Sequence, residues 1–202
     1  MKDLKFSEDE INILARIKGK KLKSYEGAMI SNGRFFMNPI KLNMPRFSVT
    51  LGLTFVPLTW TSSHRTQEME DATIFNCNEI DPYQKPYGDP ICVFPIEETV
   101  SGIVIIRDYV GTNMNESFVF DNGVILTTGS NTCSLIRYSI WDCAVYLKTR
   151  KEAEKFYSTA RARTDFSDIL DEGLKASVRR EFISLQLLVN FAISGVLVEA
   201  AS

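Results

Sequence analysis

The chain has 202 residues, of which 45% are hydrophobic and 24% are charged, and its formal net charge is −2. These proportions exclude a disordered or collagen-like chain, and a chain of this length can bury enough surface to form one domain without disulfide bonds. The near-neutral charge provides no broad positive field, so we expect no nucleic-acid partner.

The N-terminal residues predict a helix from about Glu8 to Lys18. Ser7 and Glu10 have the spacing of a capping box, and Gly19 follows the last apolar position of the helical pattern. Charged residues from the second position onward leave no apolar core for a secretory signal, so we expect a cytoplasmic protein. The lysines at the end of this helix are interpreted as a solvated face that favours the helix dipole: Lys18, Lys20, Lys21 and Lys23.

From residue 20 to about 148 the pattern of apolar residues becomes alternating. This predicts an antiparallel sheet or a barrel-like region of about eight to ten strands. The clearest strand is the segment 46–55, RFSVTLGLTF. Asn32–Gly33 and Asn122–Gly123 predict hairpin turns, because both residues of such a turn accept positive φ. The polar segments 61–71 and 81–90 are expected to be loops.

After Thr149 the pattern becomes helical again. Thr149 and Glu152 have the spacing of a second capping box, and Asp165 and Ser177 are expected to cap two further helices. The sequence therefore predicts a single α+β domain over residues 1–202. We expect its N-terminal helix in residues 1–19, the sheet in 20–148, and a helical region in 149–202 that packs on the sheet.

Residues 182–198 contain no charged side chain. As a helix, this segment lies near the lower length limit for crossing a bilayer. A polar stripe of Gln186, Asn190 and Ser194 favours a soluble core helix or an interface helix of a homo-oligomer, because lipid cannot pair these groups. A membrane anchor is the third hypothesis. The β-branched residues of the segment leave a strand possible for part of it: Ile183, Val189, Ile193, Val196 and Val198.

The sequence contains none of the usual catalytic or ligand-binding motifs. His64 is the only histidine, so an imidazole mechanism would have to pair it with Cys77 or Cys92 as nucleophile and base. Its polar loop also fits an exposed histidine without a role. We expect free thiols, no metal site and no cofactor, because His64 and the four cysteines lack ligand spacing.

Acidic residues provide a second catalytic hypothesis, a pair of carboxylates acting as acid and base. Asp108, Asp121 and Asp142 fall near expected strand ends or turns. Acidic residues at such places are normally solvated or bind turn amides. The sequence does not say which two of them would approach each other.

The loop 81–90, DPYQKPYGDP, is the candidate contact surface. Tyr83, Lys85 and Tyr87 lie among prolines that stiffen the loop, and tyrosine is enriched where proteins bind partners. The alternative is that the rings only pack the loop onto the sheet. We predict a non-enzymatic protein that binds a protein partner, such as an inhibitor or immunity-like protein. The competing hypothesis is a small hydrolase or transferase that uses a Cys–His or carboxylate pair.

Overall fold

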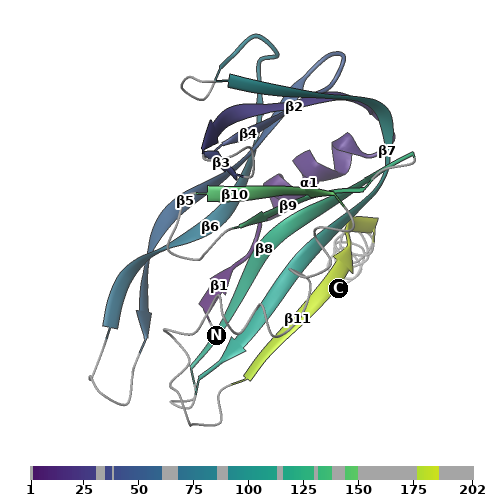
Figure 1. The fold of residues 1–202 in the computed structure, drawn as a ribbon. Coiled ribbons are helices and arrows are strands. Elements are labelled where there is room, and N and C mark those ends of the chain that lie inside the picture. The colour runs from purple at the N-terminus through teal and green to yellow at the C-terminus, as the bar shows by residue number, and fades with distance from the viewer. Residues whose placement is uncertain are drawn as a thin grey trace, which may run out of the picture.

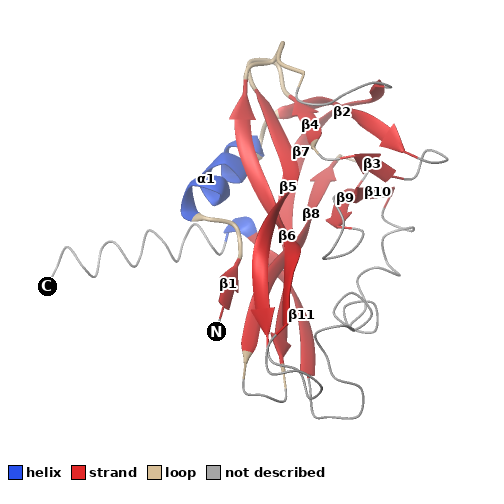
Figure 2. Ribbon diagram, turned by 90° about the vertical axis from the view of Figure 1, so that its left-hand side faces the viewer, coloured by secondary structure: helices blue, strands red, loops and turns tan. Residues whose placement is uncertain are grey.

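The computed structural model describes residues 2–30, 35–37, 39–60, 68–85, 91–112, 116–129, 132–137, 144–149 and 177–186. Within these ranges the chain is mostly β-strand with one short helix (Figures 1 and 2). The α+β fold class with C-terminal helices, which the sequence predicts, is therefore wrong. Most of the apolar surface is buried by the curvature of one sheet and not by a layer of helices.

Eleven strands and one helix make up the described part of the chain. The helix is α1 (Glu8–Ile17). The strands are β1 (Lys2–Leu4), β2 (Lys21–Ile30), β3 (Phe35–Met37), β4 (Ile40–Asn43), β5 (Ser48–Trp60), β6 (Glu68–Ile80), β7 (Ile91–Gly111), β8 (Ser117–Thr128), β9 (Thr132–Arg137), β10 (Ala144–Thr149) and β11 (Ser177–Ser184).

The strands form one continuous sheet in the order β11-β7-β8-β9-β10-β3-β2-β4-β5-β6. The neighbours in this order are antiparallel, whereas β1 pairs in parallel with β8. Strand β7 also pairs with β2, so the pairing runs from β7 through β8, β9, β10, β3 and β2 back to β7. The sheet is therefore nearly closed, and β4, β5 and β6 extend it from β2.

Strand β7 belongs to both parts of this sheet. Its residues 91–99 pair with β2, and residues 100–111 pair with β8. The register shifts near the junction, once between Leu22 and Ser24 of β2 and once between Val100 and Gly102. Such bulges bend and twist a strand. Figure 1 shows β7 turning from the upper part of the sheet into the lower part.

Helix α1 lies within the bend of the sheet, and its predicted capping box is confirmed. Ser7 Oγ accepts a hydrogen bond from the Glu10 N–H at 3.3 Å, and Glu10 Oε2 accepts one from the Ser7 N–H at 2.8 Å. The other oxygen of Glu10 accepts from the Cys77 N–H of β6 at 2.9 Å. Leu14 and Ile17 are fully buried in the main core. Glu10 therefore caps the helix and attaches it to β6.

Two local predictions of helix and turn are wrong. Ser177 begins strand β11 and does not cap a helix. Phe182–Ser184, the start of the uncharged segment, belong to the same strand, which the β-branched residues of that segment leave possible. Asn122–Gly123 lies inside β8 and forms no hairpin turn. In both cases pairing with β7 overrides the local preference of the residues. Asn32–Gly33 and the expected helices in residues 150–176 and 187–198 lie outside the described ranges.

No helix in the described ranges has both the length and the apolar character needed to span a bilayer.

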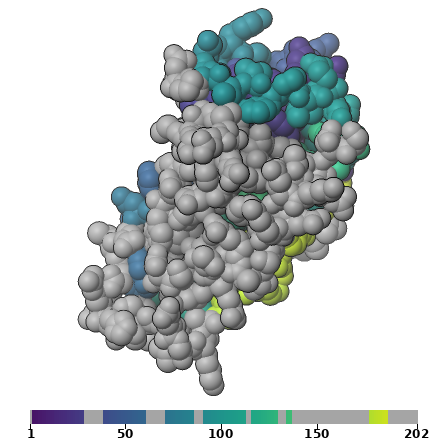
Figure 3. All heavy atoms as spheres, in the orientation of Figure 1, coloured from purple at the N-terminus to yellow at the C-terminus, as the bar shows by residue number. Residues whose placement is uncertain are grey.

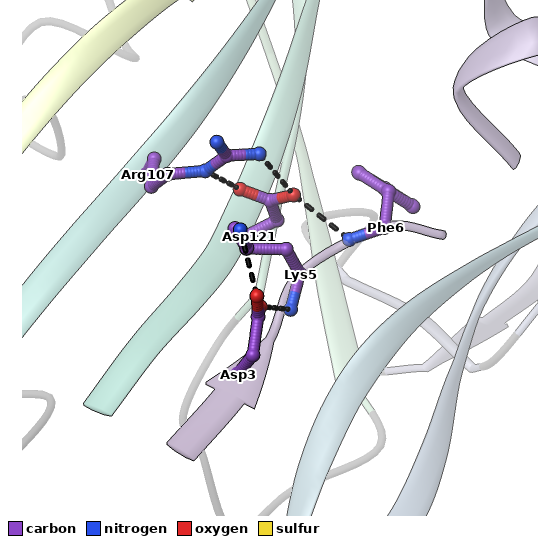
Figure 4. Close-up of polar contacts among 5 residues, drawn as sticks. All are labelled: Asp3, Lys5, Phe6, Arg107 and Asp121. Carbon is purple, nitrogen blue, oxygen red and sulfur yellow. Dashed lines mark hydrogen bonds and ion pairs between the residues drawn. The ribbon is translucent and has the colours of Figure 1, made fainter. Parts of the chain in front are cut away.

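A buried ion pair joins β7 to β8 and to the segment before α1. Arg107 donates to Asp121 through Nε at 2.7 Å and Nη2 at 2.9 Å, and Asp121 Oδ2 also accepts from the Phe6 N–H at 2.9 Å (Figure 4). The expectation that Asp121 is solvated or binds a turn amide is therefore wrong, because this carboxylate is 1% exposed in the middle of a strand.

A second buried ion pair joins β7 to β11. Arg180 donates to both oxygens of Asp108 at 2.6 Å, and Asn122 Nδ2 donates to Asp108 Oδ2 at 2.7 Å. The Asp108 and Arg180 side chains are 0% and 1% exposed. Asp108 is thus a buried strand residue and not a solvated one, whereas Asp142 lies outside the described ranges. This pair explains how a segment with two arginines in succession becomes a strand at the sheet edge.

We expect Arg180→Ala to lower the free energy of unfolding by about 3 to 5 kcal/mol, because it leaves the buried Asp108 carboxylate without its cation. Arg179→Ala is the matched control. The Arg179 side chain is 65% exposed, pairs with Glu181 at the surface and lies over the ring of Tyr109, 4.4 Å from its centre, so its loss should cost about 1 kcal/mol. Urea denaturation of both variants measures the difference, and equal losses would contradict a special role for the buried pair.

Candidate functional site

The turn that follows β6 is held by two hydrogen bonds in which its backbone N–H groups donate to Asp81. The Gln84 N–H donates to the Asp81 carbonyl at 3.0 Å, and the Tyr83 N–H donates to Asp81 Oδ1 at 2.7 Å. Aspartate and proline at the first two positions favour a tight turn of this kind. We call residues 81–84 the Tyr83 turn.

A buried lysine fixes the Tyr83 turn to the sheet. Lys41 Nζ donates to the Pro82 carbonyl at 2.6 Å and to the Gln84 carbonyl at 3.0 Å, and it lies 3.0 Å from Glu26 Oε1. These three contacts use all three N–H donors of the ammonium group. The Lys41 side chain is 3% exposed, so the turn lies over it and closes it off from water.

The sheet register places this lysine on the face opposite the main core. Lys41 pairs with Glu26 of β2, and Glu26 pairs with Val93 of β7. Residues that pair across strands share a face, whereas Ile40 and Leu42, on either side of Lys41, point to the other face and are fully buried in the core. The Tyr83 turn therefore covers the outer face of the sheet.

Two apolar side chains are open to solvent in this region. Tyr83 is 92% exposed and Val93 is 56% exposed, and Lys85 is exposed beside the turn. The ring of Tyr83 therefore does not pack the loop onto the sheet. Figure 3 shows that residues of β2 and β7, in purple and teal, are open to solvent at the upper end of the face in view. Tyr87 lies outside the described residues.

The candidate catalytic residues do not form a site in the described part of the chain. Cys77 is 1% exposed, and burial, together with the Glu10 carboxylate, raises the pKa of its thiol far above the ordinary value. Cys92 is a half-buried free thiol on β7, and the sheet order puts β2, β4 and β5 between it and Cys77. His64 lies outside the described residues.

Three carboxylates that could have acted as acid or base are instead paired with cations. Asp108 and Asp121 are each held by an arginine. Glu97 is on the surface, where a hydrogen bond from Lys21 lowers its pKa. No group of three or more His, Cys, Asp or Glu side chains in the described ranges could hold a metal ion.

Comparison with known proteins does not assign the chain to a family. No protein-family model matches the chain, and neither the curated proteins nor the solved structures contain a significant match. Only the arrangement of the described residues therefore indicates what the protein does.

Sequence reasoning identified the loop and Tyr83 but missed Lys41 and Glu26. Lys41 alternates with Ile40 and Leu42, and that pattern predicts an ordinary solvated position on the outer face of a strand. The only signal was the later Asp81–Pro82 pair, which predicts a turn but does not say what the turn contacts. The two carbonyl groups that Lys41 holds are 41 and 43 residues away in sequence.

We expect Lys41→Met to release the Tyr83 turn and to lower the free energy of unfolding by about 3 kcal/mol, since Glu26 then loses its cation. Amide hydrogen exchange of Tyr83 and Gln84 should become faster. The double variant Glu26→Gln, Lys41→Met should recover part of the stability, because no unpaired carboxylate is left. It should not recover the slow hydrogen exchange of Tyr83 and Gln84, because the turn still lacks Lys41. Lys23→Met, at an exposed lysine of β2, is the control and should change neither quantity.

We expect iodoacetamide to leave Cys77 unmodified in the folded protein, because its thiol is buried and stays protonated. Cys92 should react first of the two, and both should react after unfolding. Peptide mass spectrometry after timed labelling measures this order. Modification of Cys77 as fast as Cys92 would show that its thiol is accessible and return it to the candidate nucleophiles.

Proposed function

We propose that this protein is a non-enzymatic binding protein that recognises a protein partner through the Tyr83 turn. The observation that carries the proposal is the contrast between the ring and the backbone of Tyr83. The ring is 92% exposed, whereas the turn is held by Asp81 and by the buried ammonium group of Lys41.

A fixed and exposed aromatic ring is well suited to recognition. Tyrosine offers a large contact area with few rotatable bonds, so little conformational entropy is lost when it is buried by a partner. A backbone that is already in its bound conformation lowers the ordering cost of association further. Val93 adds a second exposed apolar group on the same side of the sheet, and Lys85 adds a charge.

An inhibitor or immunity-like protein acts in this way, through a fixed surface and without chemistry. The competing hypothesis, a hydrolase or transferase, gains no support from Cys77, whose thiol is buried, or from Asp108 and Asp121, which are buried and each paired with an arginine. The cytoplasmic location expected from the sequence stays a prediction.

We expect Tyr83→Ser to weaken binding of the partner by at least about tenfold, because a central aromatic contact contributes 2 kcal/mol or more at many interfaces. The melting temperature should stay unchanged, since the ring makes no core contact. Gln84→Ser, at the next exposed position, should change binding by less than about twofold. Immobilised protein captures the partner from a lysate of the source cells, and titration with the purified partner then gives the dissociation constants.

Two results would contradict the proposal. Equal capture by the wild type and by Tyr83→Ser would place any recognition elsewhere. A Tyr83→Ser variant that loses self-association and no other contact would make the turn a homo-oligomer interface, which sedimentation velocity detects.

A further inference from the structure

A groove of about 680 Å³ opens beside the C-terminal end of α1. Its walls come from four places: the end of α1, the turn into β2, the connection between β4 and β5, and the end of β6. Of the side chains that line it in the described part of the chain, five are cations and one is a carboxylate: Arg16, Lys18, Lys20, Lys21, Arg46 and Glu79. The groove thus concentrates positive charge in a chain whose net charge is −2.

Some of these cations are already neutralised. Arg16 pairs with Glu79, and Lys21 pairs with Glu97 at 2.6 Å. Lys18 donates to the uncharged amide oxygen of Gln186 at 2.8 Å. Within the described ranges, Lys18, Lys20 and Arg46 have no carboxylate partner, and all three are exposed. The groove therefore carries three positive charges that are exposed to solvent and not neutralised by a carboxylate of the described residues.

The helix dipole explains only part of this arrangement. Cations near the C-terminal end of a helix are favoured by its dipole, which accounts for Lys18 and Lys20. Arg46 belongs to the connection between β4 and β5, more than twenty residues later in the chain, so only the fold brings its charge to the end of α1. Fixed charges of one sign around a concave surface focus the field there and attract a ligand of opposite sign.

We infer that this groove binds an acidic segment of a partner polypeptide. The inference rests on the proposed function, since it states the chemistry of that partner. Position supports it: Ile80, the last residue of β6, pairs with Ser48, and these two residues separate the groove at Phe47 and Glu79 from the Tyr83 turn. The groove and the turn lie at the same end of β5 and β6 but on opposite faces of the sheet, since Glu79 pairs with the buried Val49 whereas the turn covers Lys41. A partner that binds both must therefore extend over this end of the sheet, where the planar guanidinium of Arg46 can bind a carboxylate through two hydrogen bonds.

The lining residues favour a polypeptide over a nucleic acid. Single-stranded nucleic acid needs open aromatic faces for base stacking. Among the described residues that line the groove, Phe47 is the one aromatic residue, and the Arg16 guanidinium already lies over its ring, 5.3 Å from the ring centre. Separate carboxylates on a flexible segment can each approach one of the three exposed cations that have no carboxylate partner in the described ranges.

Fluorescence anisotropy with the purified full chain tests the inference. The probes are a fluorescein-labelled oligoglutamate, an oligoglutamine of equal length and an oligothymidylate of equal length. We expect saturable binding of oligoglutamate that weakens as salt is raised, and no binding of oligoglutamine. The double variant Lys20→Glu, Arg46→Glu should weaken oligoglutamate binding by at least about tenfold. Lys23→Glu, an exposed lysine outside the groove lining, should weaken it by less than about twofold.

Three results would overturn the inference: no binding of oligoglutamate, tighter binding of oligothymidylate, or an equal loss in the Lys23→Glu variant. Circular dichroism shows that each variant is folded. Tyr83→Ser separates this inference from the proposed function, because it should leave oligoglutamate binding unchanged. If oligoglutamate fails to bind while Tyr83→Ser still loses the partner, only the present inference fails. If oligoglutamate binds while Tyr83→Ser keeps the partner, only the proposed function fails.

Discussion

Two buried ion pairs on consecutive residues of β7 hold this protein together. Arg107 and Asp108 point to opposite faces of the sheet, so one pair binds Asp121 and the segment entering α1, and the other binds Arg180 of β11. A shift of β11 by one residue would move Arg180 to the wrong face and leave Asp108 as an unpaired buried charge. The pairs therefore specify the register of the edge strand and the path of the chain into the helix.

A buried charge also fixes the chain on the outer face of the sheet, beneath the Tyr83 turn. Lys41 is as buried as many core residues, yet its ammonium group is fully used by Glu26 and by two carbonyls of the Tyr83 turn. A hydrophobic side chain at this position could cover the strand, but it could not hold the turn by its carbonyl groups. A single cation thus converts a proline-containing loop into a fixed support for one exposed ring.

The Tyr83 turn and the basic groove lie at the same end of β4, β5 and β6 and offer complementary means of recognition. An exposed aromatic ring contributes affinity after contact, because its burial removes apolar surface from water. The free charges of Lys20 and Arg46 act before contact, because they attract and orient an acidic partner over a distance of about one Debye length. A partner that satisfies both must combine an apolar pocket with a nearby cluster of carboxylates.

Features whose signals lie within a few residues of one another could be predicted from the sequence. The Ser7–Glu10 capping box, the alternation that becomes β5 and the turn at Asp81–Pro82 are of this kind, because their hydrogen bonds or faces are set locally. Long-range contacts are what make Ser177 begin a strand, continue a strand through Asn122–Gly123, and bury Asp108 and Lys41. Arg180 is 72 residues from Asp108, and Pro82 is 41 residues from Lys41. A local pattern cannot distinguish a solvated charge from a buried one, because the difference depends on a partner that only the fold brings within hydrogen-bond distance.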